Sequence, residues 1–306
     1  MKIGLFYFSG TGNTEIATKK WKEEIEKYNH EVSIYKIEDG NASSINFSSF
    51  DEIGFGYPVH AFNTPKIVID FVRGIKKQEV KKICFIYMVS GENLRLNNSS
   101  SNRLKRILRR KNICTRSEYH YLMPYNIIFH HSEENAYKMY DMLDRIIKVD
   151  AYYHFNTNTF HKLKKNPLSV LILWMFRIEH WFSHVNGKHY KIDTDKCIKC
   201  MKCVDTCPTH NISYEGDKFI FGNKCSLCMR CSFGCPVDAF HIGLLDNWRV
   251  NKPYEFKPQV GEENDKHKKF LIKSYNRYYK ECEEKIKKYD IIIKNETATD
   301  SCGIEK

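Results

Sequence analysis

The chain has 306 residues, enough for one large and one smaller domain, and its 42% hydrophobic content excludes a disordered protein. Lys and Arg outnumber Asp and Glu by 49 to 37. This excess of positive charge favours anionic partners, which include acidic redox proteins, nucleic acid, phosphates and membrane surfaces. The first apolar stretch, residues 3–8, is short and leads into a glycine-rich loop instead of a signal-peptide cleavage site. We therefore expect a cytoplasmic protein with reduced cysteines.

The N-terminal segment has the pattern of a strand, a loop and a helix. Residues 2–8 form a buried-strand pattern, residues 9–14 read Ser-Gly-Thr-Gly-Asn-Thr, and a helical stretch follows at 15–28. Glycines allow close backbone approach, hydroxyls donate hydrogen bonds, and a helix N-terminus directs free N–H groups at an anion. The loop lacks the lysine of a Walker loop and the spacing of a dinucleotide loop. It predicts a monophosphate site, with a simple helix cap as the alternative.

Further strand patterns, separated by helical stretches, predict a doubly wound parallel sheet of five strands. They lie at residues 32–37, 52–57, 83–89 and 119–123. In such a sheet a ligand binds outside the carboxyl ends of the strands, where the order of the strands reverses. The loops after strands one, three and four should meet there. These loops span residues 9–14, 57–63 and 90–93.

The first of these loops matches the flavodoxin phosphate loop, S/T-x-T-G-x-T, at every specified position. The N-terminal half therefore resembles flavodoxins, and the resemblance implies FMN as the ligand. We expect the flavin ring to stack on Tyr57, His60 or Phe62, and the backbone of the third loop to meet its pyrimidine edge. The second loop has no tryptophan and the third has no aromatic residue. The expected FMN-binding residues are Ser9, Gly10, Thr11, Gly12, Asn13, Thr14, Tyr57, Pro58, Val59, His60, Ser90 and Gly91.

Two segments beyond these loops have a distinctive composition. Residues 103–111 contain six basic residues around an apolar stripe, which predicts a helix with a solvated basic face or a docking patch for an acidic redox partner. Residues 167–185 begin with an apolar run that is too short to cross a bilayer, which takes about 20 residues. We expect a helix that docks two domains together. Contact of residues 168–182 with a membrane surface is the less favoured interpretation.

Eight of the twelve cysteines form two runs with the spacing C-x2-C-x2-C-x3-C-P. The second run repeats the first at an offset of 28 residues, which implies two copies of one unit. This is the spacing of bacterial ferredoxins, in which the fourth cysteine of each run binds the other cluster. We assign one 4Fe–4S cluster to Cys197, Cys200, Cys203 and Cys235, and the second to Cys225, Cys228, Cys231 and Cys207.

The alternatives to iron–sulfur clusters are disulfides and zinc. A reducing compartment disfavours disulfides, and zinc sites group their cysteines in pairs instead of threes plus one. Between the two runs, residues 212–214 and 219–221 predict a β-hairpin whose apolar face covers the clusters. The segment from residue 187 to 247 resembles bacterial two-cluster ferredoxins over its whole length.

The order of the two halves resembles the flavodoxin–ferredoxin fusions of anaerobic bacteria. We expect an α/β flavodoxin-like domain with a doubly wound parallel five-stranded sheet, followed by a small α+β ferredoxin-like domain. The predicted boundaries are 1–165 for the first domain, 166–186 for an apolar linker helix, 187–247 for the second domain and 248–306 for a C-terminal helical extension.

Such a chain is expected to pass single electrons between two 4Fe–4S clusters and FMN. Its partner would be a redox protein, which the positive charge of the chain predicts to be acidic, and we expect no nucleic acid partner. Two alternatives stay open, which are a flavin-dependent reductase of a small acceptor and a redox or oxygen sensor that binds a partner protein.

Overall fold

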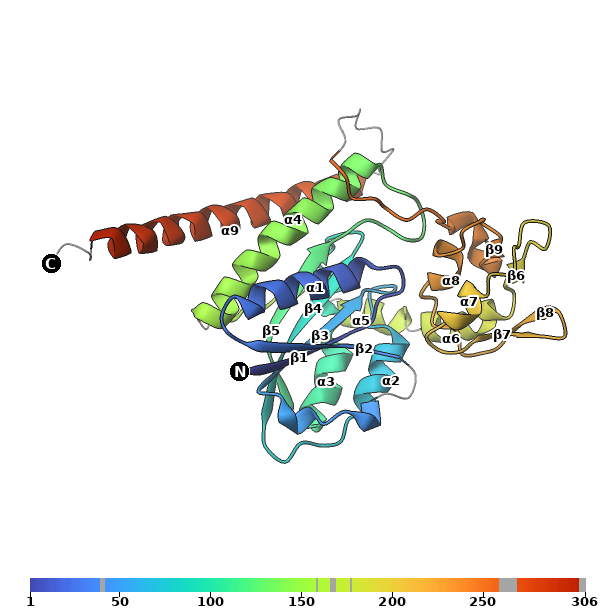
Figure 1. The fold of residues 1–306 in the computed structure, drawn as a ribbon, viewed down its shortest axis with the longest axis horizontal. Coiled ribbons are helices and arrows are strands. Elements are labelled where there is room, and N and C mark those ends of the chain that lie inside the picture. The colour runs from blue at the N-terminus through green and yellow to red at the C-terminus, as the bar shows by residue number, and fades with distance from the viewer. Residues whose placement is uncertain (39–41, 158, 166–168, 177, 259–268, 303–306) are drawn as a thin grey trace.

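The computed structural model describes residues 1–38, 42–157, 159–165, 169–176, 178–258 and 269–302. Its first domain is a five-stranded parallel sheet with helices on both faces (Figure 1). The strands are β1 (Lys2–Tyr7), β2 (Glu31–Lys36), β3 (Glu52–Pro58), β4 (Lys82–Ser90) and β5 (Ile113–Leu122). Their order, β2-β1-β3-β4-β5, is the flavodoxin order. The predicted fold class is therefore confirmed for this domain.

Helices cover both faces of the sheet, so the central strands are apolar on both sides. One face packs against α1 (Asn13–Glu26) and α4 (Glu133–Ala151), and the other against α2 (Lys66–Gly74) and α3 (Asn102–Arg110). Strand β4 shows the alternation directly, because Phe85, Tyr87 and Val89 belong to the first core while Cys84, Ile86 and Met88 belong to the second. Cys84 is therefore a core residue.

Strand β5 begins at Ile113, six residues before the predicted start at 119. Its first half is polar, and the apolar alternation that reveals a strand is missing there. Glu118 is nevertheless buried, and its carboxylate accepts hydrogen bonds from Lys105 at 2.7 Å and Lys165 at 3.0 Å. Burial opposes ionisation, but the charges of the two lysines hold the pKa of Glu118 below its usual value. Lys105 belongs to the predicted basic helix, which is α3.

The C-terminal helix α9 (Lys269–Cys302) lies along α4 and extends past the sheet (Figure 1). Its side chains Leu271, Tyr275, Tyr278, Cys282, Ile286 and Tyr289 belong to the same core as α1 and α4. Arg145 of α4 donates to Glu283 of α9 at 3.0 Å, and Lys285 of α9 forms an ion pair with the buried Asp150. The predicted C-terminal extension thus shares the core of the first domain.

The second domain is a small module with an internal repeat. Its elements are β6 (Lys191–Ile192), α7 (Lys202–Asp205), β7 (Ile212–Glu215), β8 (Lys218–Phe221), α8 (Arg230–Phe233), β9 (Phe240–His241) and the 3-10 helix η5 (Gly243–Trp248). Lys199 and Leu227 have φ angles of 53° and 50°, and Met201 and Met229 have φ angles of 57° and 60°. The left-handed residues therefore recur at the sequence offset of 28, as two copies of one unit predict. Strands β7 and β8 form the predicted hairpin.

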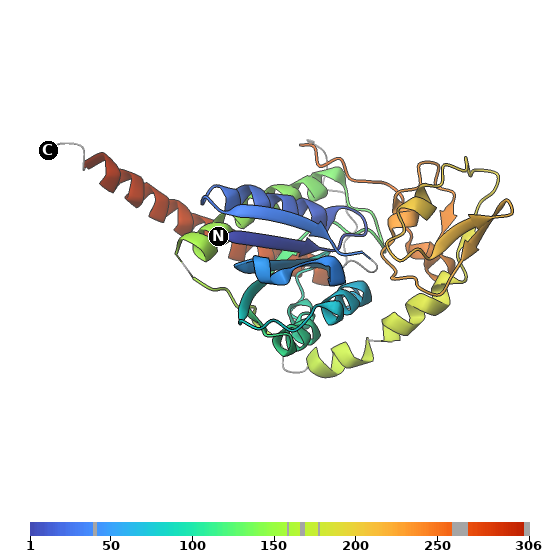
Figure 2. The ribbon, with the colours of Figure 1, turned by 60° about the horizontal axis from the view of Figure 1, so that its bottom comes forward.

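Two short helices, α5 (Ser169–Met175) and α6 (Ile178–Gly187), connect the domains along one side of the molecule (Figure 2). They replace the single linker helix that the sequence predicts, and residues 166–168 and 177 of that prediction lie outside the described part of the chain. Asn63 donates to the carbonyl of Leu173 at 3.3 Å, and Asn186 donates to the carbonyl of Ile242 at 3.0 Å. The pair thus contacts both domains. In the described part of the chain, no helix combines the length and apolarity needed to cross a membrane.

Two isoleucines of α9 test whether this helix shares the core of the first domain. Ile286 is buried at 7% exposure and Ile291 is 59% exposed. Ile286→Ala should lower the free energy of unfolding by about 2–5 kcal/mol because it removes buried methyl groups and leaves a cavity. The control Ile291→Ala should change it by less than about 0.5 kcal/mol. Equal effects in urea unfolding would contradict the shared core.

Candidate functional site

A cavity of about 500 Å³ lies at the carboxyl ends of the strands, where the sequence predicts the ligand. The loops after β1, β3 and β4 meet there. Of the expected ligand-binding residues, ten line the cavity, namely Ser9, Gly10, Thr11, Asn13, Thr14, Pro58, Val59, His60, Ser90 and Gly91. The cavity is within the size range of small-ligand pockets. Its position at the switch point of the sheet is the place where such folds bind ligands.

The phosphate loop ends in an uncapped helix. Gly12, the residue before α1, has a φ angle of 110° that L side chains rarely adopt, and no side chain caps the first turn of the helix. Its N–H donates to the hydroxyl of Ser9 at 3.0 Å, which shapes the loop. The hydroxyl of Thr14 is buried and finds no hydrogen-bond partner among the described residues. Free N–H groups and an orphaned hydroxyl are the donors that an anion requires.

Tyr57 does not face the cavity, so its predicted role as a ring-stacking residue is wrong. Strand β3 continues to Pro58, and the alternation of a strand directs Ile53, Phe55 and Tyr57 into one core. The Tyr57 side chain is fully buried, and its hydroxyl lies 3.1 Å from that of Ser100. Gly12 is also absent from the cavity wall and lies beside a neighbouring depression.

The third loop is held by a buried polar network. The Ser90 hydroxyl lies 2.6 Å from Nε2 of His120, and Nδ1 of His120 lies 2.8 Å from Oδ1 of Asn98. Burial lowers the pKa of His120 to about 3, so this ring stays neutral at physiological pH. Beside it, burial raises the pKa of the Glu92 carboxyl, which lines the cavity and accepts hydrogen bonds from Tyr125 and Asn97. These hydrogen bonds fix the position of the third loop.

Much of the apolar cavity wall comes from segments that the sequence analysis did not assign to the site. Tyr125 follows β5, and Leu227, Met229 and Trp248 come from the second domain. From the first domain, His60 and Phe62 of the second loop also line the cavity, as expected for ring-stacking residues. The signal in the sequence was weak, because only the position of Leu227 and Met229 beside Cys228 marks them as special.

The two domains touch at the phosphate loop. A Cβ atom on Gly10 would lie 2.0 Å from the carbonyl oxygen of Cys228, a separation that no side chain tolerates. Cys228 itself lines the cavity. Arg230, two residues on, donates to the carbonyl of Ser9 at 2.8 Å and to that of Thr206 at 2.7 Å. One guanidinium thus joins the phosphate loop to both cysteine runs, and glycine at position 10 is required for the contact.

Four cysteines from both runs line one small cavity in the second domain. They are Cys207, Cys225, Cys228 and Cys231. The fourth cysteine of the first run thus lies with the first three of the second run, which is the crossed arrangement. The N–H of Asn211 donates to the sulfur of Cys207 at 3.2 Å, and its Nδ2, which is buried, finds no partner among the described residues. A cluster with its sulfide ions would supply acceptors for such donors.

The pKa shifts of the thiols group the cysteines in the same way. Burial raises the pKa of Cys231, and the neighbouring Cys228, Cys225 and Cys207 raise it further. Burial likewise raises the pKa of Cys203 to about 11, and its cysteine neighbours are Cys197 and Cys200 of its own run. Thiolates crowded in this way repel one another unless iron neutralises them.

No disulfide joins the described cysteines, all of which are free thiols. In the same part of the chain, no group of three or more His, Cys, Asp or Glu residues is arranged to hold a single metal ion.

The two cysteine runs differ in exposure. Cys200 of the first run is exposed and the adjacent Ile198 is 61% exposed, whereas Cys225 of the second run is buried. The N–H of Ala239 donates to the sulfur of Cys235 at 3.3 Å, which repeats the bond from Asn211 to Cys207 at the offset of 28 residues. The first run therefore faces solvent, while the second faces the first domain.

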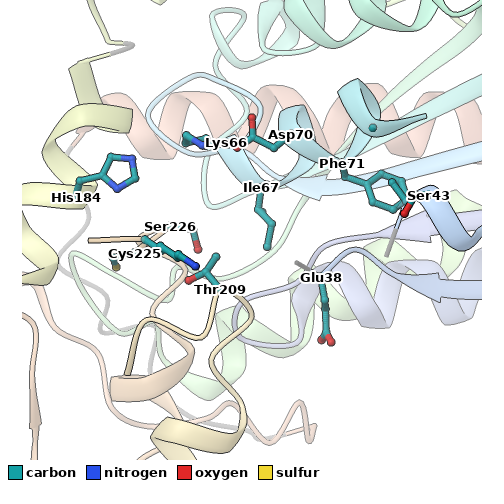
Figure 3. Close-up of a pocket in the computed structure, with 13 residues that line it drawn as sticks. Glu38, Ser43, Lys66, Ile67, Asp70, Phe71, His184, Thr209, Cys225 and Ser226 are labelled. Carbon is teal, nitrogen blue, oxygen red and sulfur yellow. Dashed lines mark hydrogen bonds and ion pairs between the residues drawn. The ribbon is translucent and has the colours of Figure 1, made fainter. Parts of the chain in front are cut away.

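A second cleft, of about 460 Å³, separates the domains on another side of the second run (Figure 3). Lys66, Ile67 and Asp70 of α2 line one wall, and His184 and Cys225 line the opposite one. Lys66 and Asp70 form an ion pair within α2. Besides the contact at Gly10, the domains meet where the N–H of Ile128 donates to the carbonyl of Trp248 at 2.7 Å and where Phe233 packs with Ala136.

Comparisons with known proteins bear on both domains. A family model described as a 4Fe–4S binding domain matches residues 190–213, which contain the complete first cysteine run. The chain joins a flavodoxin-like domain to a 4Fe–4S ferredoxin-like module. This fusion follows from the family match together with the strand order of the first domain. Comparison with curated proteins gives no match.

Solved structures similar to the fusion include three flavodoxins. The flavodoxin of Streptococcus pneumonia TIGR4 is 14% identical, with 47% of this chain and 95% of that chain covered and a TM-score of 0.34. Flavodoxin 2 from Bacillus cereus is 18% identical, with 49% and 99% covered and a TM-score of 0.35. The Megasphaera elsdenii flavodoxin is 18% identical, with 39% and 84% covered and a TM-score of 0.33.

The contact between Gly10 and Cys228 makes a prediction about the Gly10→Ala variant. Its Cβ would push the second cysteine run away from the phosphate loop, while the thiols themselves keep their ligand positions. We expect unchanged iron content and about tenfold faster amide hydrogen exchange in residues 9–12 and 227–230, since loosening by about 1.4 kcal/mol has that effect. Gly74→Ala is the control, because its Cβ would meet only the Ala42 side chain, at 3.2 Å. Exchange equal to wild type in Gly10→Ala would show that the loops do not touch.

Proposed function

We propose that the fusion carries electrons between two 4Fe–4S clusters and FMN within one chain. The observation that supports this most strongly is the position of Cys228. It is a member of the thiol-lined cavity of the second domain and also a wall of the cavity beside the phosphate loop. A ligand of one redox group would therefore lie against the other. Clusters exchange one electron at a time and FMN holds one or two, so the pair interconverts one-electron and two-electron chemistry.

The cysteines supply two cages that differ in access. In our assignment the outer cage consists of Cys197, Cys200, Cys203 and Cys235, and the inner cage consists of Cys225, Cys228, Cys231 and Cys207. The exposed Cys200 supports entry or exit of electrons at the outer cage. The inner cage lies between the outer cage and the cavity of the first domain. The order outer cage, inner cage, flavin follows from this arrangement.

The residues along the whole length of the first-domain cavity suit FMN. At one end, the uncapped start of α1 and the Thr14 hydroxyl would bind the phosphate. Toward the second domain the wall is apolar, and Tyr125, Met229 and Trp248 would cover the flavin ring. His60 and Gly91 complete the wall from the first domain. These groups orient the ring against the inner cage and keep water from it.

The order of outer cage, inner cage and flavin also predicts where a redox partner docks. Electrons that enter at the outer cage require a redox protein that docks on the second domain near Cys200. Helix α3 lies on the first domain, not on the second (Figure 1). Its Arg106, Arg109 and Arg110 are exposed. We therefore propose that the donor docks on the module and that α3 is a solvated face.

The composition of the loaded protein tests the proposal. After anaerobic purification and reconstitution, we expect about eight iron, about eight acid-labile sulfide and about one FMN per chain, as two four-iron clusters require. Full clusters without flavin would reduce the first domain to a phosphate-binding scaffold. Four iron per chain would overturn the two-cluster assignment.

A cysteine variant tests the cages separately. Cys200→Ser should lower the iron content by about half, because it removes one ligand of the outer cage and leaves the inner cage complete. FMN content should not change. Cys114→Ser is the control, since Cys114 lies in β5 and outside both cages. Retention of all iron in Cys200→Ser, measured together with the paramagnetic signals of the reduced protein, would contradict the ligand assignment.

A threonine pair tests the phosphate site. Thr14→Val removes a hydroxyl that has no partner among the described residues, so FMN affinity should fall about tenfold or more, as loss of a hydrogen bond to a charged group implies, while stability without ligand is kept. The Thr18 hydroxyl lies 2.8 Å from both the Thr14 carbonyl and the Tyr87 hydroxyl. Thr18→Val should therefore lower stability and leave FMN affinity nearly unchanged. Equal affinities of wild type and Thr14→Val would refute the phosphate contact.

A further inference from the structure

The outer face of the two connecting helices carries a stripe of large apolar side chains. Leu171, Trp174, Met175, Ile178 and Trp181 are each between 60% and 65% exposed. Leu171 lies three and four residues before Trp174 and Met175 on α5, and Ile178 lies three residues before Trp181 on α6, so each helix carries its exposed apolar side chains on one face. Exposed apolar side chains are ordinary when scattered singly, but a contiguous patch of this kind indicates an interaction surface. We call these five residues the apolar stripe.

The other face of the same helices already packs on the protein. Leu173 is buried, the Ser169 hydroxyl lies 2.6 Å from that of Ser99, and Asn186 donates to the second domain. Phe176 and Phe182 line the cavity beside the phosphate loop. The segment is therefore held in place through its inner face. The two helices run along the side of the molecule that Figure 2 shows at the bottom.

Basic side chains surround the stripe. Between residues 159 and 192 the sequence contains six Lys or Arg and only one acidic residue, Glu179. Lys162, Lys164, Lys188 and Lys191 are exposed at the two ends of the segment. A groove of about 530 Å³ runs beside Trp181, and Lys188, Lys224, His184 and His189 line it. An indole next to ammonium groups suits a ligand that has an apolar part and an anionic part.

We propose that the apolar stripe docks the protein on the surface of a membrane that contains anionic phospholipid. Tryptophan concentrates at the level of the lipid headgroups, and lysines beside an apolar face bind anionic lipid. Both helices are far shorter than a membrane span, which suits a segment that lies in the interface. An acidic protein would meet the lysines but would leave the stripe uncovered. The proposal does not depend on the cofactors.

Vesicle binding tests the proposal on the full chain. The wild-type protein is sedimented with vesicles of phosphatidylcholine alone and with vesicles of phosphatidylcholine and phosphatidylglycerol. We expect binding only to the second kind, and weaker binding at about 1 M salt, where the Debye length falls to about 3 Å. The Trp174→Ser/Trp181→Ser double variant should bind about tenfold more weakly. The double variant Val80→Ser/Ile291→Ser is the control, since these side chains are 72% and 59% exposed elsewhere on the molecule.

Several outcomes would overturn the proposal. These are no binding by the wild type, equal binding to both kinds of vesicle, or equal binding by the tryptophan variant and the control. If the wild type does not bind vesicles but forms a dimer that the tryptophan substitutions convert to monomers, the stripe would be assigned to self-association instead. Should the variant fail to fold, tryptophan emission of the wild type decides the question. Quenching by phosphatidylglycerol with brominated acyl chains supports docking, and its absence refutes it.

Discussion

The rest of the site depends on one close contact, in which the backbone of the phosphate loop meets the backbone of the second cysteine run. Gly10 has no side chain because the Cys228 carbonyl occupies the space where a Cβ would lie. Arg230 holds the contact through hydrogen bonds to carbonyl groups on both sides. A cavity that would otherwise open to solvent on the first domain is thereby closed by Leu227, Met229 and Trp248 of the second. The ligand pocket is a joint product of the two domains.

The internal repeat of the second domain supports this contact. Each copy bends at left-handed residues and directs a backbone N–H at its fourth cysteine sulfur, from Asn211 in the first copy and Ala239 in the second. The two copies share these backbone features and differ in what surrounds them. One copy presents Cys200 to solvent, and the other presents Cys228 to the first domain. Two similar copies thus differ in what they contact, solvent in one case and the first domain in the other.

Local patterns in the sequence predicted the elements and the loops well. The strands, the phosphate loop and the hairpin follow from spacing and alternation over a few residues, while the strand order and the pairing of Cys207 with the second run follow from the resemblance to flavodoxins and bacterial ferredoxins. Tyr57 lies inside β3, which continues to Pro58, and the alternation of that strand directs its side chain into the core with Ile53 and Phe55. The polar start of β5 was missed because Glu118 is buried only through its pairing with lysines.

Contacts between distant segments could not be predicted in the same way. Nothing in the sequence around Trp248 or Tyr125 indicates that both line one cavity, since the two residues are 123 positions apart in the chain. The packing of α9 on α4 depends equally on the complete fold. The requirement for glycine at position 10 is likewise visible only when Cys228 is in place. The sequence predicts the parts of the site, and the domain contact determines its shape.

The central claim is that electrons pass between the cages and the flavin within one chain. The most direct measurement is the rate at which bound FMN loses its absorbance when the loaded protein is mixed anaerobically with excess one-electron reductant, at several protein concentrations. The account predicts a rate constant that does not depend on protein concentration and that matches the bleaching of the clusters. A rate constant that rises in proportion to protein concentration would contradict it, because electrons would then reach the flavin from another chain.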